Sequence, residues 1–130
     1  MKAELLLGDL QAALSRLEEA LILDVESDVY KAGCIQYFEF TFELAWKSIK
    51  ATAEEAGLDA GGSPKSSLKT AYRQGWIADE EVWLEMLEAR NRMSHTYDAK
   101  DALKVYEKLK GFVEPLRNLV NSLKESTATQ

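Results

Sequence analysis

The sequence predicts an all-α protein: an up-and-down four-helix bundle with one additional short helix. Apolar residues recur at steps of three and four over several long stretches, and no stretch alternates with period two for long enough to indicate a strand. Ser, Pro and Gly residues separate these stretches. The length of 130 residues suits one domain with one core. We expect this domain to cover residues 1–124, followed by a flexible tail at 125–130.

The first two helices are expected at about 2–23 and 28–56. In the first, leucines recur with helical spacing, at Leu6, Leu10, Leu14, Leu17 and Leu21. Ser27 or Asp28 is a candidate N-cap of the second helix, and Gly57 suits its C-terminal end. One face of this second helix should enter the core, through Phe38, Phe42, Ala45, Trp46 and Ile49, while its other apolar residues, Tyr37, Phe40, Leu44 and Tyr30, point elsewhere. A second subunit could cover this surplus apolar surface.

Three further helices follow a polar break. Ser63 and the proline after it predict a helix start, giving a short helix over about 64–74. A fourth helix is expected over about 79–94. Asp98 resembles the N-cap of a last helix, whose apolar face comprises Leu103, Tyr106, Leu109, Phe112 and Val113. Pro115 should kink this helix because it lacks a backbone N–H.

Composition excludes several classes of function. The single Cys34 and single His95 leave no disulfide framework and argue against a zinc site within one chain, so we expect no metal and no cofactor. A di-iron bundle would need a Glu three residues before a His, but that position holds Arg92. Cys34 is expected to be a small core residue rather than a nucleophile. No apolar run is long enough for a membrane span or signal peptide, so a cytoplasmic location is expected.

The densest group of reactive side chains surrounds the end of the fourth helix, in the segment 88–98. It contains two guanidiniums, an amide, an imidazole and a phenol: Arg90, Arg92, Asn91, His95 and Tyr97. Imidazole exchanges a proton near neutral pH, and arginine holds a phosphate and its transition-state charge, so the group suits phosphodiester cleavage. The alternative is that Arg90 and His95 only cap the helix and pair with Glu85 or Glu88.

Helical geometry limits how Arg90 and His95 can act together. Five residues apart on an ideal helix, they lie about 140° apart around its axis. They can converge only if the helix distorts near Ser94 or if a second subunit supplies one of them. Asn91 and His95, four apart, share a face.

A second candidate site is a basic stripe on the short third helix. Lys65, Lys69 and Arg73 are spaced by four, and no acidic residue lies between Gly61 and Ala78. The net charge of -6 argues against coating of nucleic acid by the whole surface, but a local stripe could hold RNA or nucleotide phosphates. The alternative is a solvated helix face.

Two blocks of sequence carry a family resemblance. Residues 37–47 read YFEFTFELAWK, and residues 83–91 read WLEMLEARN before SHTY at 94–97. Together with Ser63-Pro64 and the turn at 75–77, they resemble the HEPN-domain family, in particular its nucleotidyltransferase substrate-binding protein subfamily, which includes HepT-like toxins. The spacing of Arg90, His95 and Tyr97 is similar to the Arg-x4-His-x-Tyr signature of HEPN toxins. The likeness covers about residues 5–120.

The resemblance implies a homodimer that works beside a minimal nucleotidyltransferase. It also implies a metal-independent endoribonuclease, with His95 as general base or acid, Arg90 stabilising the phosphorane, and Asn91 orienting the phosphate or His95. AMPylation of Tyr97 by the partner would silence the toxin. Arg92 and the basic stripe would bind RNA or a nucleotide. The family also suggests a second possibility, a non-catalytic nucleotide- or substrate-binding subunit, and a purely structural adaptor is a third.

Overall fold

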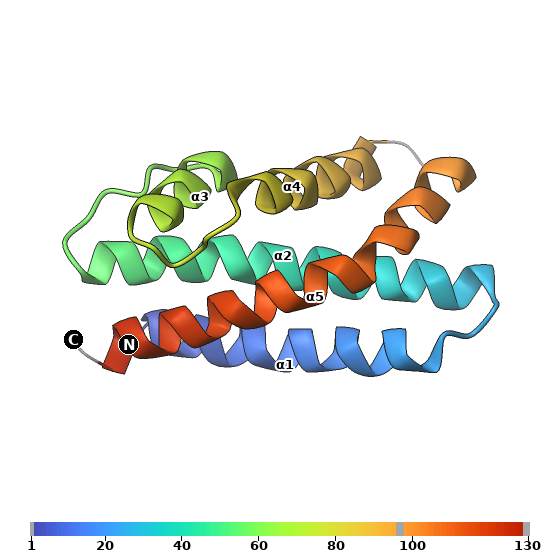
Figure 1. Ribbon diagram of the computed structural model, residues 1–130, viewed down its shortest axis with the longest axis horizontal. Helices are drawn as coiled ribbons and strands as arrows, with labels where there is room; N and C mark the ends of the chain where they lie inside the picture. The colour runs from blue at the N-terminus through green and yellow to red at the C-terminus, as the bar shows by residue number, and fades with distance from the viewer. Residues whose placement is uncertain (1, 96–97, 129–130) are drawn as a thin grey trace.

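The computed structural model describes residues 2–95 and 98–128, and over these residues the chain is all α-helix (Figure 1). Its elements in chain order are α1 (Lys2–Leu23), α2 (Asp28–Glu55), α3 (Pro64–Arg73), α4 (Glu80–His95) and α5 (Ala99–Ala128). The predicted fold class and the number of helices are therefore confirmed. The expected tail at 125–130 begins inside α5, because residues 125–128 are helical.

Helix α2 lies at the centre of the bundle and packs against the other four helices, whereas α1 packs on α2 and α5 only. Figure 1 shows α3 and α4 on one side of α2 and α1 on the other, while α5 crosses in front of α2 from the end of α4 to α1. The predicted face of α2 makes the core: Phe38 stacks on Phe112 of α5 at 5.4 Å between ring centroids, and Phe42 lies 6.4 Å from the Trp83 ring of α4. Each such buried ring contributes about 1.5–3 kcal/mol of transfer free energy.

The ends of the helices follow the predicted caps. Ser27 caps α2 by accepting from the Tyr30 N–H at 3.3 Å, and Asp98 caps α5 by accepting from the Lys100 N–H at 2.8 Å. The side chain of Ser63 accepts from the backbone of Ser66 in a capping box at the start of α3. These bonds satisfy backbone N–H groups that have no partner within the helix.

Two residues predicted to belong to the core do not. Leu6 is only half-buried while its neighbour Leu7 is buried, so Leu7 replaces Leu6 at the start of a stripe that otherwise is buried as predicted. Leu103 is 45% exposed, because it lies in the first turns of α5, where the helix borders an open groove. Pro115 lies inside α5, and the helix continues across it.

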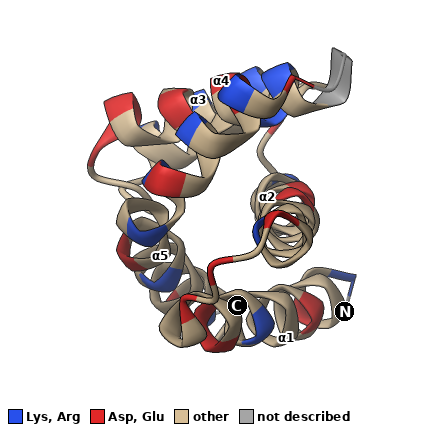
Figure 2. Cartoon of the chain, turned by 90° about the vertical axis from the view of Figure 1, so that its right-hand side faces the viewer, with Lys and Arg blue, Asp and Glu red and all other residues tan. Residues whose placement is uncertain are grey.

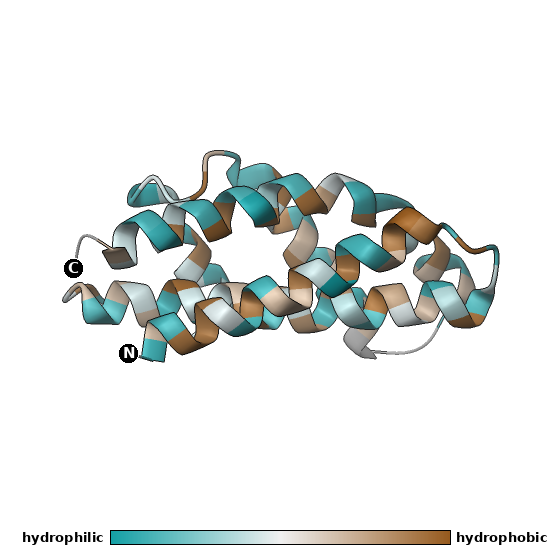
Figure 3. Cartoon of the chain, turned by 90° about the horizontal axis from the view of Figure 1, so that it is seen from below, coloured by the Kyte–Doolittle hydropathy of each residue, from teal (hydrophilic) through white to brown (hydrophobic). Residues whose placement is uncertain are grey.

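The turn between α1 and α2 exposes an unusual number of aliphatic side chains. Figure 3 shows hydrophobic positions at the end of α1 and in the loop that follows, where Ile22, Leu23 and Val25 are exposed. Among the described residues, no helix is long and apolar enough to cross a membrane.

Candidate functional site

The C-terminal half of α4 carries the predicted Arg-His segment, and its backbone stays helical through Ser94 to His95. The helix therefore does not distort near Ser94, and Arg90 and His95 stand about 140° apart around it. Of the two routes to convergence, a distortion of the helix near Ser94 is not seen. The side chain of His95 and the whole of Tyr97 lie outside the described residues.

Arg90 is held between α4 and α2. Its guanidinium forms an ion pair with Glu43 of α2, and both side chains are only about 30% exposed, at 29% and 30%. Its Nη1 also donates to Asn91 Oδ1 at 3.1 Å. The acidic partner of Arg90 in this ion pair therefore comes from another helix, and not from Glu85 or Glu88 of α4 as the alternative interpretation expected for its partners. Arg92 takes Glu88 instead, at 3.1 Å.

Glu43 is itself held in place by a neighbour on α2. The indole Nε1 of Trp46 donates to Glu43 Oε2 at 3.0 Å, which leaves Oε1 to Arg90. Trp46 is partly buried against the core, so the carboxylate is attached to a rigid part of the bundle. The Arg90 guanidinium therefore pairs with a carboxylate that is itself held by a hydrogen bond from Trp46.

Glu39 lies one turn before Glu43 on α2. Burial raises the pKa of its carboxyl, the positive charge of Arg90 opposes that rise, and the negative charge of Glu43 adds to it. Sequence reasoning missed both glutamates. The available signal was two acidic residues at i and i+4 on a helix that is otherwise strongly apolar, a costly arrangement without a cation opposite.

Beside these carboxylates lies a pocket of about 450 Å³ between α2, the end of α4 and the start of α5. Its wall on α2 consists of residues that share one helical face, and α4 and α5 supply the rest: Asp28, Lys31, Ala32, Ile35, Glu39, Met93, Ala99, Lys100, Ala102 and Leu103. Met93 and Ala99 flank the segment 94–98 that carries His95 and Tyr97. The pocket and the predicted motif are therefore adjacent along the chain.

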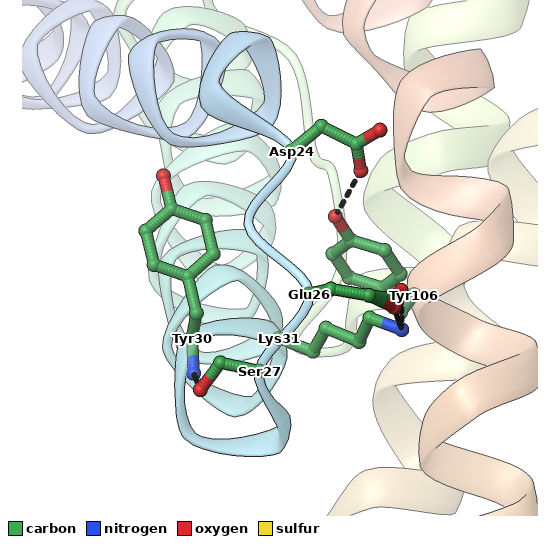
Figure 4. A network of polar contacts seen from close by, with 6 residues as sticks. All are labelled: Asp24, Glu26, Ser27, Tyr30, Lys31 and Tyr106. Atoms are coloured by element: carbon green, nitrogen blue, oxygen red, sulfur yellow. Dashed lines mark hydrogen bonds and ion pairs between the residues drawn. The ribbon is translucent and has the colours of Figure 1, made fainter.

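Lys31 connects this pocket to a polar network at the α1–α2 turn (Figure 4). Its Nζ contacts both carboxylate oxygens of Glu26, at 2.8 and 3.1 Å, and lies 5.3 Å from the centroid of the Tyr106 ring. The hydrogen bond to Glu26 is the main cause that raises the pKa of Lys31. Lys31 therefore stays protonated at neutral pH.

Tyr106 closes the same network onto α5. Its hydroxyl donates to Asp24 Oδ1 at 3.2 Å, and Asp24 has a left-handed backbone with φ of 45°. Burial first, and then the bond to Asp24, raise the pKa of Tyr106 to about 12. The Tyr106 hydroxyl is therefore a fixed hydrogen-bond donor at physiological pH. Its bond to Asp24 joins α5 to the α1–α2 turn, and the Tyr106 ring contacts Lys31, which lines the pocket.

The basic stripe is exposed but lies away from this pocket. Lys65, Lys69 and Arg73 are exposed on α3, and none of them forms an ion pair within the part of the chain that the structure describes. Helix α3 lies at the end of the bundle from which α4 starts (Figure 1). It packs against α4, a helix of 16 residues about 24 Å long that ends at His95.

The lysine and arginine residues of α3 and of α4 lie at the same side of the bundle. In the end-on view of Figure 2, both sets lie on the side opposite α1. The structure thus places Arg90 and Asn91 together and close to α2, and leaves Arg92 on another side of α4, near Lys104 and Lys108. Among the described residues, no three His, Cys, Asp or Glu side chains cluster as possible metal ligands.

The chain is an all-α bundle whose fourth helix carries Arg90 and ends at His95, an arrangement that fits the HEPN class expected from the sequence. The family model described as "Nucleotidyltransferase substrate binding protein like" matches residues 5–125. The chain belongs to this family, as the two sequence blocks predicted.

One similar curated protein and two similar solved structures support the assignment. A Haemophilus influenzae protein named "Probable ribonuclease HepT" is 31% identical over 96% of both chains. A crystal structure of a Thermus thermophilus protein superposes with a TM-score of 0.80 at 31% identity, covering 88% of this chain and 98% of the other. A Haemophilus influenzae structure, described as the fold of a substrate binding domain of a nucleotidyltransferase, has a TM-score of 0.81 at 31% identity, covering 91% and 98%.

Proposed function

We propose that this protein is a metal-independent endoribonuclease toxin that acts as a homodimer and is controlled by a minimal nucleotidyltransferase partner. The observation that carries the proposal is the pre-positioned Arg90, paired with Glu43 and bonded to Asn91, five residues before the only histidine. The 31% identity to a protein named as a probable ribonuclease, over almost the full length of both chains, supports the same reaction class.

The reaction needs no group beyond the RNA and these side chains. One His95 removes the proton from a 2′-OH, whose oxygen attacks the adjacent phosphorus. The bond from phosphorus to the 5′-oxygen breaks, and a protonated imidazole gives that oxygen its proton. The products are a 2′,3′-cyclic phosphate and a 5′-OH. Arg90 stabilises the charge that develops on the phosphorane, and Asn91 orients it.

A homodimer would bring together catalytic groups that one chain cannot place in one site. A chain with one histidine cannot supply a separate acid and base, and Arg90 and His95 diverge around a continuous α4. Helix α2 also exposes Tyr37 and Phe40, aromatic surface that a second subunit would cover. We therefore assign acid and base to the His95 residues of two subunits.

The partner would act at Tyr97. An adenylyl group there would add a bulky anion close to His95 and repel the RNA backbone. Arg92 would hold a nearby phosphate, and the stripe Lys65, Lys69 and Arg73 would hold more distant phosphates of the same RNA, because α3 lies at the end of the bundle from which α4 starts, whereas His95 ends α4.

The decisive test uses the full chain purified without partner and shown by intact mass to be unmodified. We expect RNA cleavage with cyclic-phosphate ends, lost by about 10²–10⁴-fold in His95→Ala and Arg90→Ala. Arg16→Ala, at an exposed site far along α1, is the matched control and should retain full activity. RNA left intact by the unmodified wild type would refute the proposal.

Subunit mixing tests the two-histidine assignment. Wild-type and His95→Ala chains are mixed, exchanged and assayed over a range of ratios. If each site needs both histidines, activity follows the square of the wild-type fraction. A linear dependence would show that one His95 is sufficient for each site.

A second function is favoured by a specific observation. The related structure described as a nucleotidyltransferase substrate binding domain, together with the pocket beside Glu39, fits a non-catalytic nucleotide- or substrate-binding subunit. Calorimetry with nucleotides, with and without the nucleotidyltransferase, tests it. Binding that requires the complex, combined with no RNA cleavage by this chain, would establish this function in place of the first.

A further inference from the structure

We propose that the pocket between α2 and α5 binds one nucleotide whose base carries an exocyclic amino group, with the base edge at Glu39 and the phosphate near Lys31 and Lys100. This inference rests on the proposed function, because it assigns a base subsite to the same RNA- or nucleotide-binding site. It adds a specificity that the Arg-His motif by itself does not provide.

The walls of the pocket suit a flat ring. Ala32, Ala99 and Ala102 leave room on both helices, while Ile35 and Leu103 provide apolar surface. Met93 closes the α4 side, and its thioether makes favourable contacts with aromatic rings. Leu103 is exposed although it lies on the predicted core face of α5, because it borders this opening. A stacked base would cover it.

The two ends of the pocket differ in chemistry. Glu39 stands at the inner end, close to Arg90, and offers acceptor oxygens. Lys31 and Asp28 line the pocket nearer the start of α2, and Lys100 lines it from the start of α5. Lys31 and Glu39 are eight residues apart on α2, about 12 Å along the axis, which is comparable with the span of one nucleotide from base edge to phosphate.

The charges select the base. A glutamate acceptor matches the exocyclic amino group of cytosine, and the same argument applies to adenine and guanine, whereas uracil presents a carbonyl there. Lys31 is partly neutralised by Glu26, so Lys100, exposed three residues after Tyr97, is the main phosphate contact. The ligand could be a nucleotide of the RNA or the adenylyl group carried by a modified Tyr97, since both have the same chemistry.

The test measures binding in the full-length His95→Ala chain, so that it does not depend on cleavage. Short oligo(A), oligo(C) and oligo(U) are titrated, and oligo(U) is expected to bind about tenfold more weakly. Glu39→Gln should reduce that preference to within about twofold, because an amide both donates and accepts. Equal binding of oligo(U), or a preference unchanged by Glu39→Gln, would overturn the proposal.

A pair of matched variants tests the location. Leu103→Glu places a carboxylate in the pocket and should weaken binding of all three oligonucleotides at least tenfold. Leu84→Glu, at a similarly exposed leucine of α4 outside the pocket, should leave binding unchanged. Wild-type binding by Leu103→Glu would place the nucleotide elsewhere and refute the proposal.

Two further experiments distinguish an RNA nucleotide from the adenylyl group of Tyr97 as the ligand, and the pocket proposal from the ribonuclease proposal. If the pocket receives the adenylyl group, AMP binds the unmodified chain by ligand-observed NMR and no longer binds the chain modified at Tyr97. If AMP binds both forms equally, the subsite serves RNA. Selective binding without any cleavage would refute the ribonuclease but retain the pocket, whereas cleavage without Glu39-dependent selectivity would refute the pocket alone.

Discussion

The ion pair between Arg90 and Glu43 offers a quantitative test of how α2 positions the candidate site. Arg90→Gln and Glu43→Gln are combined in a double-mutant cycle, which subtracts whatever else each side chain contacts. The amide introduced by Glu43→Gln keeps an acceptor for the Trp46 indole, so the cycle isolates the charge. The chain supplies its own control, since Arg92 and Glu88 form an exposed pair on the same helix α4.

The expected magnitude follows from burial. Opposite charges about 4 Å apart attract by about 4 kcal/mol at an effective dielectric constant of about 20, and removing both groups from water cancels much of this. With side chains 29% and 30% exposed, we expect Arg90 and Glu43 to couple by about 1–2 kcal/mol. Arg92 and Glu88, at 48% and 67%, should couple by about 0.3–0.5 kcal/mol.

The assay is urea unfolding of the two sets of variants at low and high salt. The coupling of the exposed pair should largely disappear at high salt, and that of the inner pair should persist. A coupling between Arg90 and Glu43 no larger than the control would refute the reasoning that α2 anchors the guanidinium. In the cleavage assay, Glu43→Gln should lower kcat about tenfold with little change in KM, and Glu19→Gln, at the exposed partner of Arg16 on α1, should leave both unchanged.

Three further predictions concern stability. Tyr106→Phe removes the hydrogen bond that closes the α1–α2 turn onto α5 and should cost about 1 kcal/mol in urea unfolding; no loss would mean that the bond contributes nothing net. Gly61→Ala should lower the free energy of unfolding by about 2–3 kcal/mol, because the backbone φ is +71° and the new Cβ would lie 2.5 Å from Ser66 Oγ. Gly62→Ala is the control, since its Cβ would meet no atom within 4 Å. Because burial raises the pKa of Glu39, the folded chain binds its proton more tightly, and stability falls as pH rises through the interval between the unfolded and folded pKa. Glu39→Gln should therefore raise the free energy of unfolding at pH 7 and change it least below about pH 4, and a destabilised variant at pH 7 would contradict this.

Prediction from the sequence succeeded where the determining interactions are local. The bounds of α1 to α4 and the start of α5 matched within one residue, because caps such as Ser27, Ser63 and Asp98 act over three or four positions. The core face of α2 was predicted from its period, and the structure buries Phe38 and Phe42 completely. The prediction that Leu103 is buried was wrong, because periodicity indicates which face of a helix is apolar but not whether a neighbouring helix covers that face.

The residues of the candidate site also differ in whether local sequence could reveal them. The segment holding Arg90, Asn91 and His95 was recognisable because its members are neighbours in sequence. Glu43 was missed, since nothing local indicates that an acidic residue of α2 meets an arginine 47 positions later. The roles assigned to His95 and Tyr97 stay predictions, as do those of the basic stripe.

By itself, the sequence determined the helices, their caps, the apolar faces and the family, because each depends on spacing within a few residues. Only the tertiary structure decided that Arg90 faces α2 while Arg92 faces away, that the basic stripe lies at the far end of α4, and that a pocket opens beside the motif. These features depend on how helices distant in the chain cross and pack. That arrangement is set by the summed burial of the whole core, which no local pattern encodes.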